Sequence, residues 1–117
     1  EGRIRINGMS DDFSMNPDQA VPLALIVTEI VTNSIKYAFP EGRAGTISVN
    51  LSVANGIATL KIGDNGIGCL IESGAFADQL GIGLKLIKGF ARQLNADLQQ
   101  SCENGTHYTL TFTLEEN

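Results

Sequence analysis

The sequence contains no tryptophan, one histidine and only two cysteines. Because His107 is the only imidazole, a metal site built from several histidines is excluded. Cys69 and Cys102 lie far apart and match no metal-ligand spacing, so we expect two reduced thiols, with a disulfide as the open alternative. We interpret His107, in a strand-like segment, as a structural or surface residue and not as a phosphorylated one, because a phosphoacceptor would be expected on an exposed helix.

Long apolar runs are missing as well. The longest, residues 21–27, already contains Pro22, and it falls far short of the roughly 20 residues that cross a bilayer. The N-terminus, Glu1-Gly2-Arg3, has neither a methionine nor the basic and apolar regions of a secretory signal. We therefore expect a cytoplasmic fragment of a longer protein, and that parent is either soluble or membrane-anchored.

Basic residues are outnumbered by acidic ones. Eight Lys and Arg against 13 Asp and Glu give a net charge of −5, which disfavours nucleic acid as a partner because phosphate backbones select basic surfaces. A polyanionic ligand would need local help from a divalent metal, a helix N-terminus or a few lysines. The length and the hydrophobic content of 43% suit one globular domain over residues 1–117.

The order of apolar and polar residues predicts an α+β fold. Alternation predicts strands at residues 3–8, 46–53, 57–62, 97–102 and 106–114. Asn55-Gly56 predicts a hairpin turn, helical spacing predicts helices at about 17–39 and 81–94, and residues 69–80 predict a loop or flap. Strands paired in hairpins favour a mixed, mostly antiparallel sheet with the helices on one face, a two-layer α/β sandwich.

The first predicted helix has two different faces. Its apolar stripe, at helical spacing, consists of Leu23, Ile26, Val27, Ile30 and Ser34, with Ala38 as an open continuation. The opposite sector, roughly 100° wide, combines a carboxylate, an amide, an ammonium and a phenol from Glu29, Asn33, Lys36 and Tyr37. A carboxylate can act as a base, an amide oxygen suits Mg²⁺, and an ammonium attracts phosphate. The alternative is a solvated helix face.

A turn rich in glycine follows the third predicted strand directly, as Asp64-x-Gly66-x-Gly68. Its glycines let the backbone approach a flat ligand closely. An aspartate at a strand end can accept a hydrogen bond from the exocyclic amine of adenine, whereas guanine would present a carbonyl and leave two acceptors facing each other. The alternative is an ordinary turn built from Asp, Asn and Gly.

Gly81 and Gly83 open the second predicted helix. Free N–H groups at a helix start, together with the helix dipole, suit an anion such as phosphate. Lys85 and Lys88 in the first turns oppose the usual dipole preference, which also suggests a bound anion. The segment is not a P-loop, because GxxxxGK[ST] is absent, and the alternative is a flexible helix entry. Gly105-Thr106 reads on its own as a hairpin turn.

Together and in this order, the four segments resemble the nucleotide-binding boxes of the GHKL ATPase superfamily, over about residues 22–113. Glu29-x-x-x-Asn33-x-x-Lys36-Tyr37 resembles the asparagine box. Asp64-x-Gly66-x-Gly68 resembles the first glycine box, Gly81-x-Gly83-Leu84 the second and Gly105-Thr106 the third.

Within the superfamily the chain is most similar to bacterial sensor histidine kinases with a variant dimerisation domain. The subfamily named for His, Trp and Glu signatures fits less well. The chain has no tryptophan, and Thr28 stands where that group has a histidine before Glu29. The chain departs from the commonest kinase pattern in its short flap, where Phe76 only partly replaces a phenylalanine box.

The resemblance implies a role for each residue. ATP would be bound by Asn33, Lys36, Tyr37, Asp64, Gly66, Gly68, Gly81, Gly83, Leu84, Lys85 and Thr106. Asp64 would bind adenine N6, Gly81 and Gly83 would cradle the phosphates, and Asn33 would ligate the Mg²⁺ that bridges them. Glu29 would act as a base or orient the nucleophile, so that Glu29 and Asn33 are the expected catalytic pair.

The resemblance also implies an activity. ATP with Mg²⁺ would donate its γ-phosphoryl group to a histidine on the protein's own dimerisation domain, with a response regulator downstream. This fragment lacks the acceptor helix, so we expect a monomer, cut from a homodimeric parent, that binds ATP without phosphorylating itself. The alternatives are a serine kinase of the anti-sigma-factor type and a nucleotide-binding docking module that transfers nothing.

Overall fold

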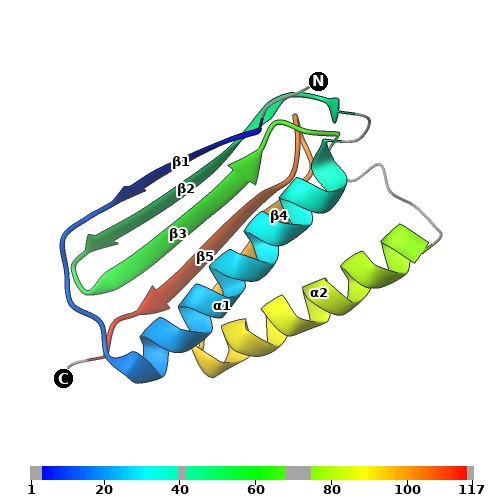
Figure 1. The fold of residues 1–117 in the computed structure, drawn as a ribbon. Helices are drawn as coiled ribbons and strands as arrows, with labels where there is room; N and C mark the ends of the chain where they lie inside the picture. Colours follow the sequence, from blue (N-terminus) through cyan, green and yellow to red (C-terminus); the bar gives the residue numbers. More distant parts are fainter. Residues whose placement is uncertain (1–3, 40–41, 68–74, 116–117) are drawn as a thin grey trace.

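The computed structural model describes residues 4–39, 42–67 and 75–115, with the backbone alone at residues 75–80. Figure 1 shows the described elements in chain order. They are β1 (Ile4–Ser10), α1 (Pro17–Asn33), the π-helical turn η1 (Ser34–Ala38), β2 (Gly45–Ala54), β3 (Ile57–Asp64), α2 (Ala75–Gln93), β4 (Asp97–Ser101) and β5 (His107–Thr113).

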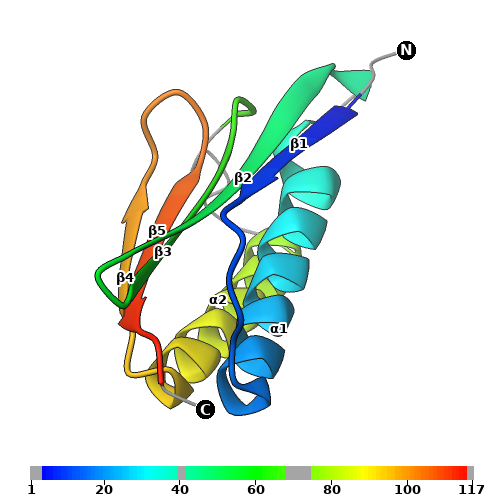
Figure 2. The same ribbon diagram turned by 90° about the vertical axis from the view of Figure 1, so that its left-hand side faces the viewer.

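The strands form one five-stranded sheet in the order β1-β2-β3-β5-β4. β1 runs parallel to β2, and the other neighbouring pairs are antiparallel. Both α1 and α2 lie on the same face of the sheet, and no helix of the described residues covers the opposite face (Figure 2). The predicted α+β class, a two-layer sandwich with a mixed, mostly antiparallel sheet, is therefore confirmed.

The core lies between the two layers. Along β3 the residues Ala58, Leu60 and Ile62 are buried, and the residues between them face away from the helices, as the period of two in a strand requires. The helices contribute Leu23, Ile26, Ile30, Ser34 and Ala38 from the predicted stripe and its continuation, and Ile87, Ala91 and Leu94 from the α2 region. The stripe thus faces the sheet.

α1 begins at a polar cap and ends in a wider turn. Asn16 caps the helix, since its side-chain oxygen accepts from the backbone N–H of Asp18 at 2.9 Å, and Pro17 takes the first helical position, where a missing N–H costs nothing. The predicted extent to about residue 39 agrees with the structure. However, residues 34–38 form a π-turn, an i→i+5 arrangement that shifts the side-chain register.

Two predicted boundaries are wrong. Gly63 and Asp64 continue β3 instead of ending it, because Gly63 pairs with Ser48 on one side and with His107 on the other. α2 begins at Ala75 and not at Gly81, so residues 75–80 belong to the helix, while residues 69–74 lie outside the described residues. The predicted hairpin is confirmed, with positive φ of 54° at Asn55 and 77° at Gly56.

Two smaller expectations can also be compared with the structure. Cys102 is disulfide-bonded, so the expectation of two reduced thiols is wrong; Cys69 itself lies outside the described residues. In the part of the chain that the structure describes, neither helix combines the length and the apolar character needed to cross a bilayer.

Candidate functional site

The end of β3 brings a buried carboxylate against the end of α1. Asp64 is only 4% exposed, because it follows Leu60 and Ile62 on the helix-facing side of the strand. Its Oδ1 accepts hydrogen bonds from the N–H groups of Gly66 at 3.0 Å and Thr106 at 3.2 Å. Its Oδ2 accepts from the Ser34 hydroxyl at 2.9 Å. The carboxylate is therefore held by donors from three different segments of the chain.

The backbone around Asp64 is packed too tightly for side chains at two glycines. A Cβ at Gly66 would collide with the carbonyl oxygen of Ala38, and one at Gly105, where φ is 112°, would collide with the carbonyl oxygen of Asp64. Backbone hydrogen bonds join the same segments, from Asp64 N–H to Thr106 O and from Ile67 N–H to Ala38 O, each 3.0 Å. Gly66 is thus required by the packing itself, whether or not a ligand lies beside it.

Glu29 and Asn33 lie one turn apart on α1, where α2 crosses it. A Cβ built on Gly83 would lie 2.8 Å from Asn33 Nδ2 and 2.9 Å from Glu29 Oε2, so both polar groups touch the backbone of α2. Asn33 Nδ2 is buried without a hydrogen-bond partner. An unpaired buried donor costs about 1–3 kcal/mol, so this amide is poised to gain from a ligand that accepts a hydrogen bond.

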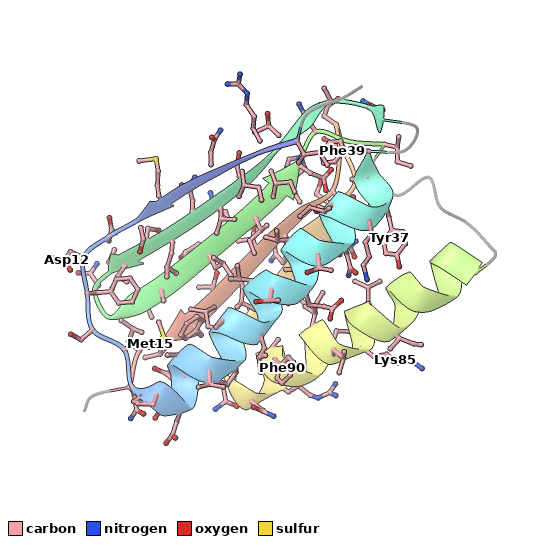
Figure 3. The ribbon with its side chains drawn as sticks, viewed as in Figure 1. Asp12, Met15, Tyr37, Phe39, Lys85 and Phe90 are labelled. Carbon is pink, nitrogen blue, oxygen red and sulfur yellow. The ribbon has the colours of Figure 1, made fainter. Side chains whose placement is uncertain are left out.

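Tyr37 lies on the same side of the helix as Glu29 and Asn33, as the predicted polar sector requires, and Lys36 departs from it. Lys36 is exposed, whereas Tyr37 is 8% exposed and lies on the side of the helix that faces α2 (Figure 3).

The predicted phosphate-binding helix start is not formed in this structure. Gly81 and Gly83 are the seventh and ninth residues of α2, and only the first four N–H groups of a helix lack an intrahelical partner. Leu84 is half-buried against the core, and the exposed Lys85 points away from α1 (Figure 3). Gly68 lies outside the described residues.

Electrostatics at this end of the sheet affect one neighbouring phenol. Tyr108 is 8% exposed. Its burial, and to a smaller extent the negative charge of Asp64, raises the pKa of Tyr108 to about 12. Both causes disfavour the phenolate, so Tyr108 stays protonated and neutral beside the Asp64 carboxylate at ordinary pH.

The residues present fit ATP with Mg²⁺ at the base and at the metal, but not at the phosphates. Asp64 offers a buried acceptor to a base, and Glu29 with Asn33 offers oxygen ligands of the kind that Mg²⁺ prefers. Within the described residues no cluster of three or more His, Cys, Asp or Glu side chains could hold a metal. Mg²⁺ would therefore depend on phosphate oxygens, its usual partners. The phosphate cradle is the part that the present course of α2 does not supply.

A shallow hollow of about 370 Å³ opens mainly on the helix-free face of the sheet. Its polar lining includes Ser48, Lys61, His107 and Thr109, which alternate with the buried residues of the same strands. Asp64 also lines this hollow, while its side chain bonds Ser34 on the helix side.

Sequence reasoning missed Ser34 as a polar member of the site and assigned it to the apolar stripe. The structure buries it to 7% exposure and directs its hydroxyl to Asp64. The available signal was a hydroxyl on the core side of the helix, directly after Asn33 and near the predicted position of a buried aspartate.

A mixed sheet covered on one face by two helices, with a buried aspartate at a strand end facing an asparagine-bearing helix, defines an ATP-binding domain of the GHKL type. The chain belongs to the family of histidine kinase-, DNA gyrase B-, and HSP90-like ATPases, which matches residues 18–116.

Named relatives are sensor kinases. The chain is 26% identical over 111 residues to the sensor histidine kinase PdtaS of Mycobacterium tuberculosis, covering 92% of this chain and 22% of that protein. It is 24% identical over 98 residues to blue-light-activated histidine kinase 2 of Erythrobacter litoralis, covering 83% of this chain and 28% of that protein. The chain thus spans less than a third of either relative.

A solved structure shares the fold. The histidine kinase domain of a blue-light activated histidine kinase from Erythrobacter litoralis superposes with a TM-score of 0.83, at 23% identity, over 97% of this chain and 53% of that one. At this level of identity the likeness establishes the fold alone.

Proposed function

We propose that this chain binds ATP with Mg²⁺ and presents its γ-phosphoryl group to a histidine on a dimerisation domain of the same parent protein, in two-component signalling. The observation that carries the proposal is the connection between Asp64 and the asparagine box. Ser34, which donates to Asp64, directly follows Asn33, so the base-binding carboxylate and the metal-binding amide are held at one helix end. Adenine and phosphate would bind at opposite sides of that helix end.

Each residue contributes positioning or charge. The Asp64 carboxylate accepts from an amine and so selects adenine. Asn33 orients the phosphates, and Glu29, beside it, holds the proton of the attacking imidazole or orients that imidazole. Bound Mg²⁺ would neutralise charge on the phosphates, and phosphoryl transfer needs little beyond such positioning and electrostatic stabilisation. Because the acceptor histidine lies on another domain, the isolated chain would bind ATP without phosphorylating itself.

Titration calorimetry with ATP and Mg²⁺ tests the proposal. We expect saturable binding of ATP, no comparable binding of GTP, and loss of ATP binding in Asp64→Asn, whose amide would replace one acceptor oxygen with a donor. Asp97→Asn is the matched control, because Asp97 lies in β4 and is exposed. Equal binding of ATP and GTP, or no binding by the folded chain, would contradict the proposal.

One observation favours a second candidate. The N–H groups of Gly81 and Gly83 lie inside α2, where they cannot bind phosphate. A module that binds nucleotide weakly and regulates a partner by docking needs no ordered phosphate cradle. Phosphorylation of the parent's histidine by ATP, with acid-labile product, would reject this candidate, and acid-stable product would indicate a serine or threonine kinase instead.

A further inference from the structure

The hydrogen bonds of Asp64 leave a single acceptor direction free. A carboxylate offers about four lone-pair positions, two on each oxygen. Oδ1 receives two donors, from the N–H groups of Gly66 and Thr106, and Oδ2 receives one, from the Ser34 hydroxyl. The remaining position on Oδ2 is the one a ligand can use, and its direction is set by where Ser34 has placed its proton.

Ser34 is committed to this bond. Its hydroxyl has one proton, which it donates to Asp64 Oδ2 over 2.9 Å in a buried setting. Ser34 is 7% exposed and Asp64 is 4% exposed, so water competes little for either group. A serine hydroxyl can ordinarily rotate and donate to a carbonyl, but rotation here would deprive a buried carboxylate of a charge-assisted hydrogen bond, which is among the stronger kinds.

We propose that Ser34 is a specificity-determining positioning residue, which fixes the free lone pair of Asp64 Oδ2 and keeps a donor away from the base. The corner formed by Asp64 and Ser34 then presents acceptors only. Such a corner suits the exocyclic amine of adenine and opposes the carbonyl that guanine carries at the same position. This inference rests on the proposed ATP function. It gives a role to Ser34, which was not among the predicted site residues.

A thermodynamic cycle between Ser34 and the exocyclic amine tests the role. The variants are Ser34→Ala, Ser34→Thr, which keeps a hydroxyl, and Thr28→Ala. Thr28 is the matched control, because its exposed hydroxyl on the same helix bonds only the carbonyl of Ala24. The two ligands are ATP and purine riboside triphosphate, which has hydrogen in place of the amine, and binding is measured by calorimetry with Mg²⁺.

We expect Ser34→Ala to weaken the binding of ATP by roughly five- to ten-fold, the usual loss for one hydrogen bond. Its effect on purine riboside triphosphate should stay below about two-fold, because that ligand does not use the corner. Ser34→Thr should retain most of the preference for ATP, and Thr28→Ala should bind both ligands as the unchanged chain does.

Two results would overturn the role of Ser34. Either Ser34→Ala binds ATP as tightly as the unchanged chain, or it weakens both ligands equally, which is what a purely structural serine would do. Failure of the unchanged chain to bind ATP would instead refute the proposed function, so the two failures are distinguishable.

Discussion

At the scale of single residues, the site is organised by what surrounds one carboxylate. Asp64 was predicted from its position after a strand, and the structure adds that it is buried and held by the backbone of Gly66 and Thr106. Glu29 and Asn33 were predicted from helical spacing, and their contact with Gly83 brings them to the crossing of the two helices. Their roles in binding and transfer stay predictions.

Glu29→Gln separates binding from transfer. The amide keeps the size of the carboxylate and removes its charge and basicity, so in the full-length parent we expect ATP affinity to change less than about two-fold. Phosphorylation of the acceptor histidine should fall by about 100-fold or more, the usual share of a general base. Single-turnover phosphorylation with labelled ATP measures the second effect. Unchanged transfer would remove Glu29 from the catalytic pair.

Tyr108 predicts a loss of stability at high pH. Its pKa is raised from 10.0 to about 12 in the fold, so the folded state holds a proton that the unfolded state releases between these values. The contribution is fully present below pH 10 and is lost as pH rises through 12, by an amount on the order of 2–3 kcal/mol.

Urea unfolding of the unchanged chain and of Tyr108→Phe between pH 9 and about 12 measures this contribution. Phenylalanine does not titrate, so the difference in unfolding free energy between the two proteins should shift with pH in favour of the variant. A difference that stays constant across this range would show that the phenol ionises as freely in the fold as in the unfolded chain.

At the scale of elements, local chemistry predicted what depends on neighbours in sequence. The hairpin at Asn55-Gly56 and the helix-facing residues of β3 follow from turn chemistry and alternation. The π-turn after Asn33 and the early start of α2 depend on contacts across the fold, such as the bond from Ile67 N–H to Ala38 O. The spacing of residues in the sequence does not predict them. Gly81 and Gly83 were predicted to open a helix, but they lie inside α2.

That position of the glycines yields a prediction. Glycine in a helix interior costs roughly 0.5–1 kcal/mol relative to alanine, and a methyl at Gly81 or at Gly89 would meet no atom within 4 Å. Both Gly81→Ala and Gly89→Ala should therefore raise the free energy of unfolding by about that amount.

Only one of the two variants should affect ATP. Phosphate could bind the N–H groups near Gly81 only if the helix opens there, so Gly81→Ala should weaken ATP by roughly two- to five-fold, the same free energy expressed as affinity. Gly89→Ala, farther along α2, is the control and should bind ATP unchanged. Equal affinities for both variants would mean that α2 keeps its helical course when ATP binds.

At the scale of the whole molecule, the sheet separates the proposed binding end from an end that holds the two layers together. Asp64 ends β3 beside the start of β5, whereas Gln19 fastens the far end of β5 to the start of α1 (Figure 1). Gln19 is 3% exposed. Its amide donates to Thr113 O and accepts from Glu115 N–H, both at 2.9 Å. The α+β class and this two-layer arrangement followed from the order of strands and helices, but the buried glutamine did not.

Gln19→Leu should destabilise the fold without touching the site. The substitution removes two part-buried hydrogen bonds, each of which contributes about 0.5–1.5 kcal/mol. The midpoint of urea unfolding should fall accordingly, while ATP affinity under native conditions should stay within about two-fold, because independent sites act additively. A large loss of ATP affinity in a folded variant would show that the two ends are coupled.

An amide NMR titration of the ¹⁵N-labelled chain with ATP and Mg²⁺ tests whether ATP binds at the helix-side end of β3. We expect the largest shifts at the N–H groups of Gly66 and Thr106 and at the side-chain amide of Asn33, and little change at Lys61 and Thr109 on the helix-free face. Saturating ATP that leaves these three groups unmoved, or that shifts only the helix-free face, would contradict binding at this end.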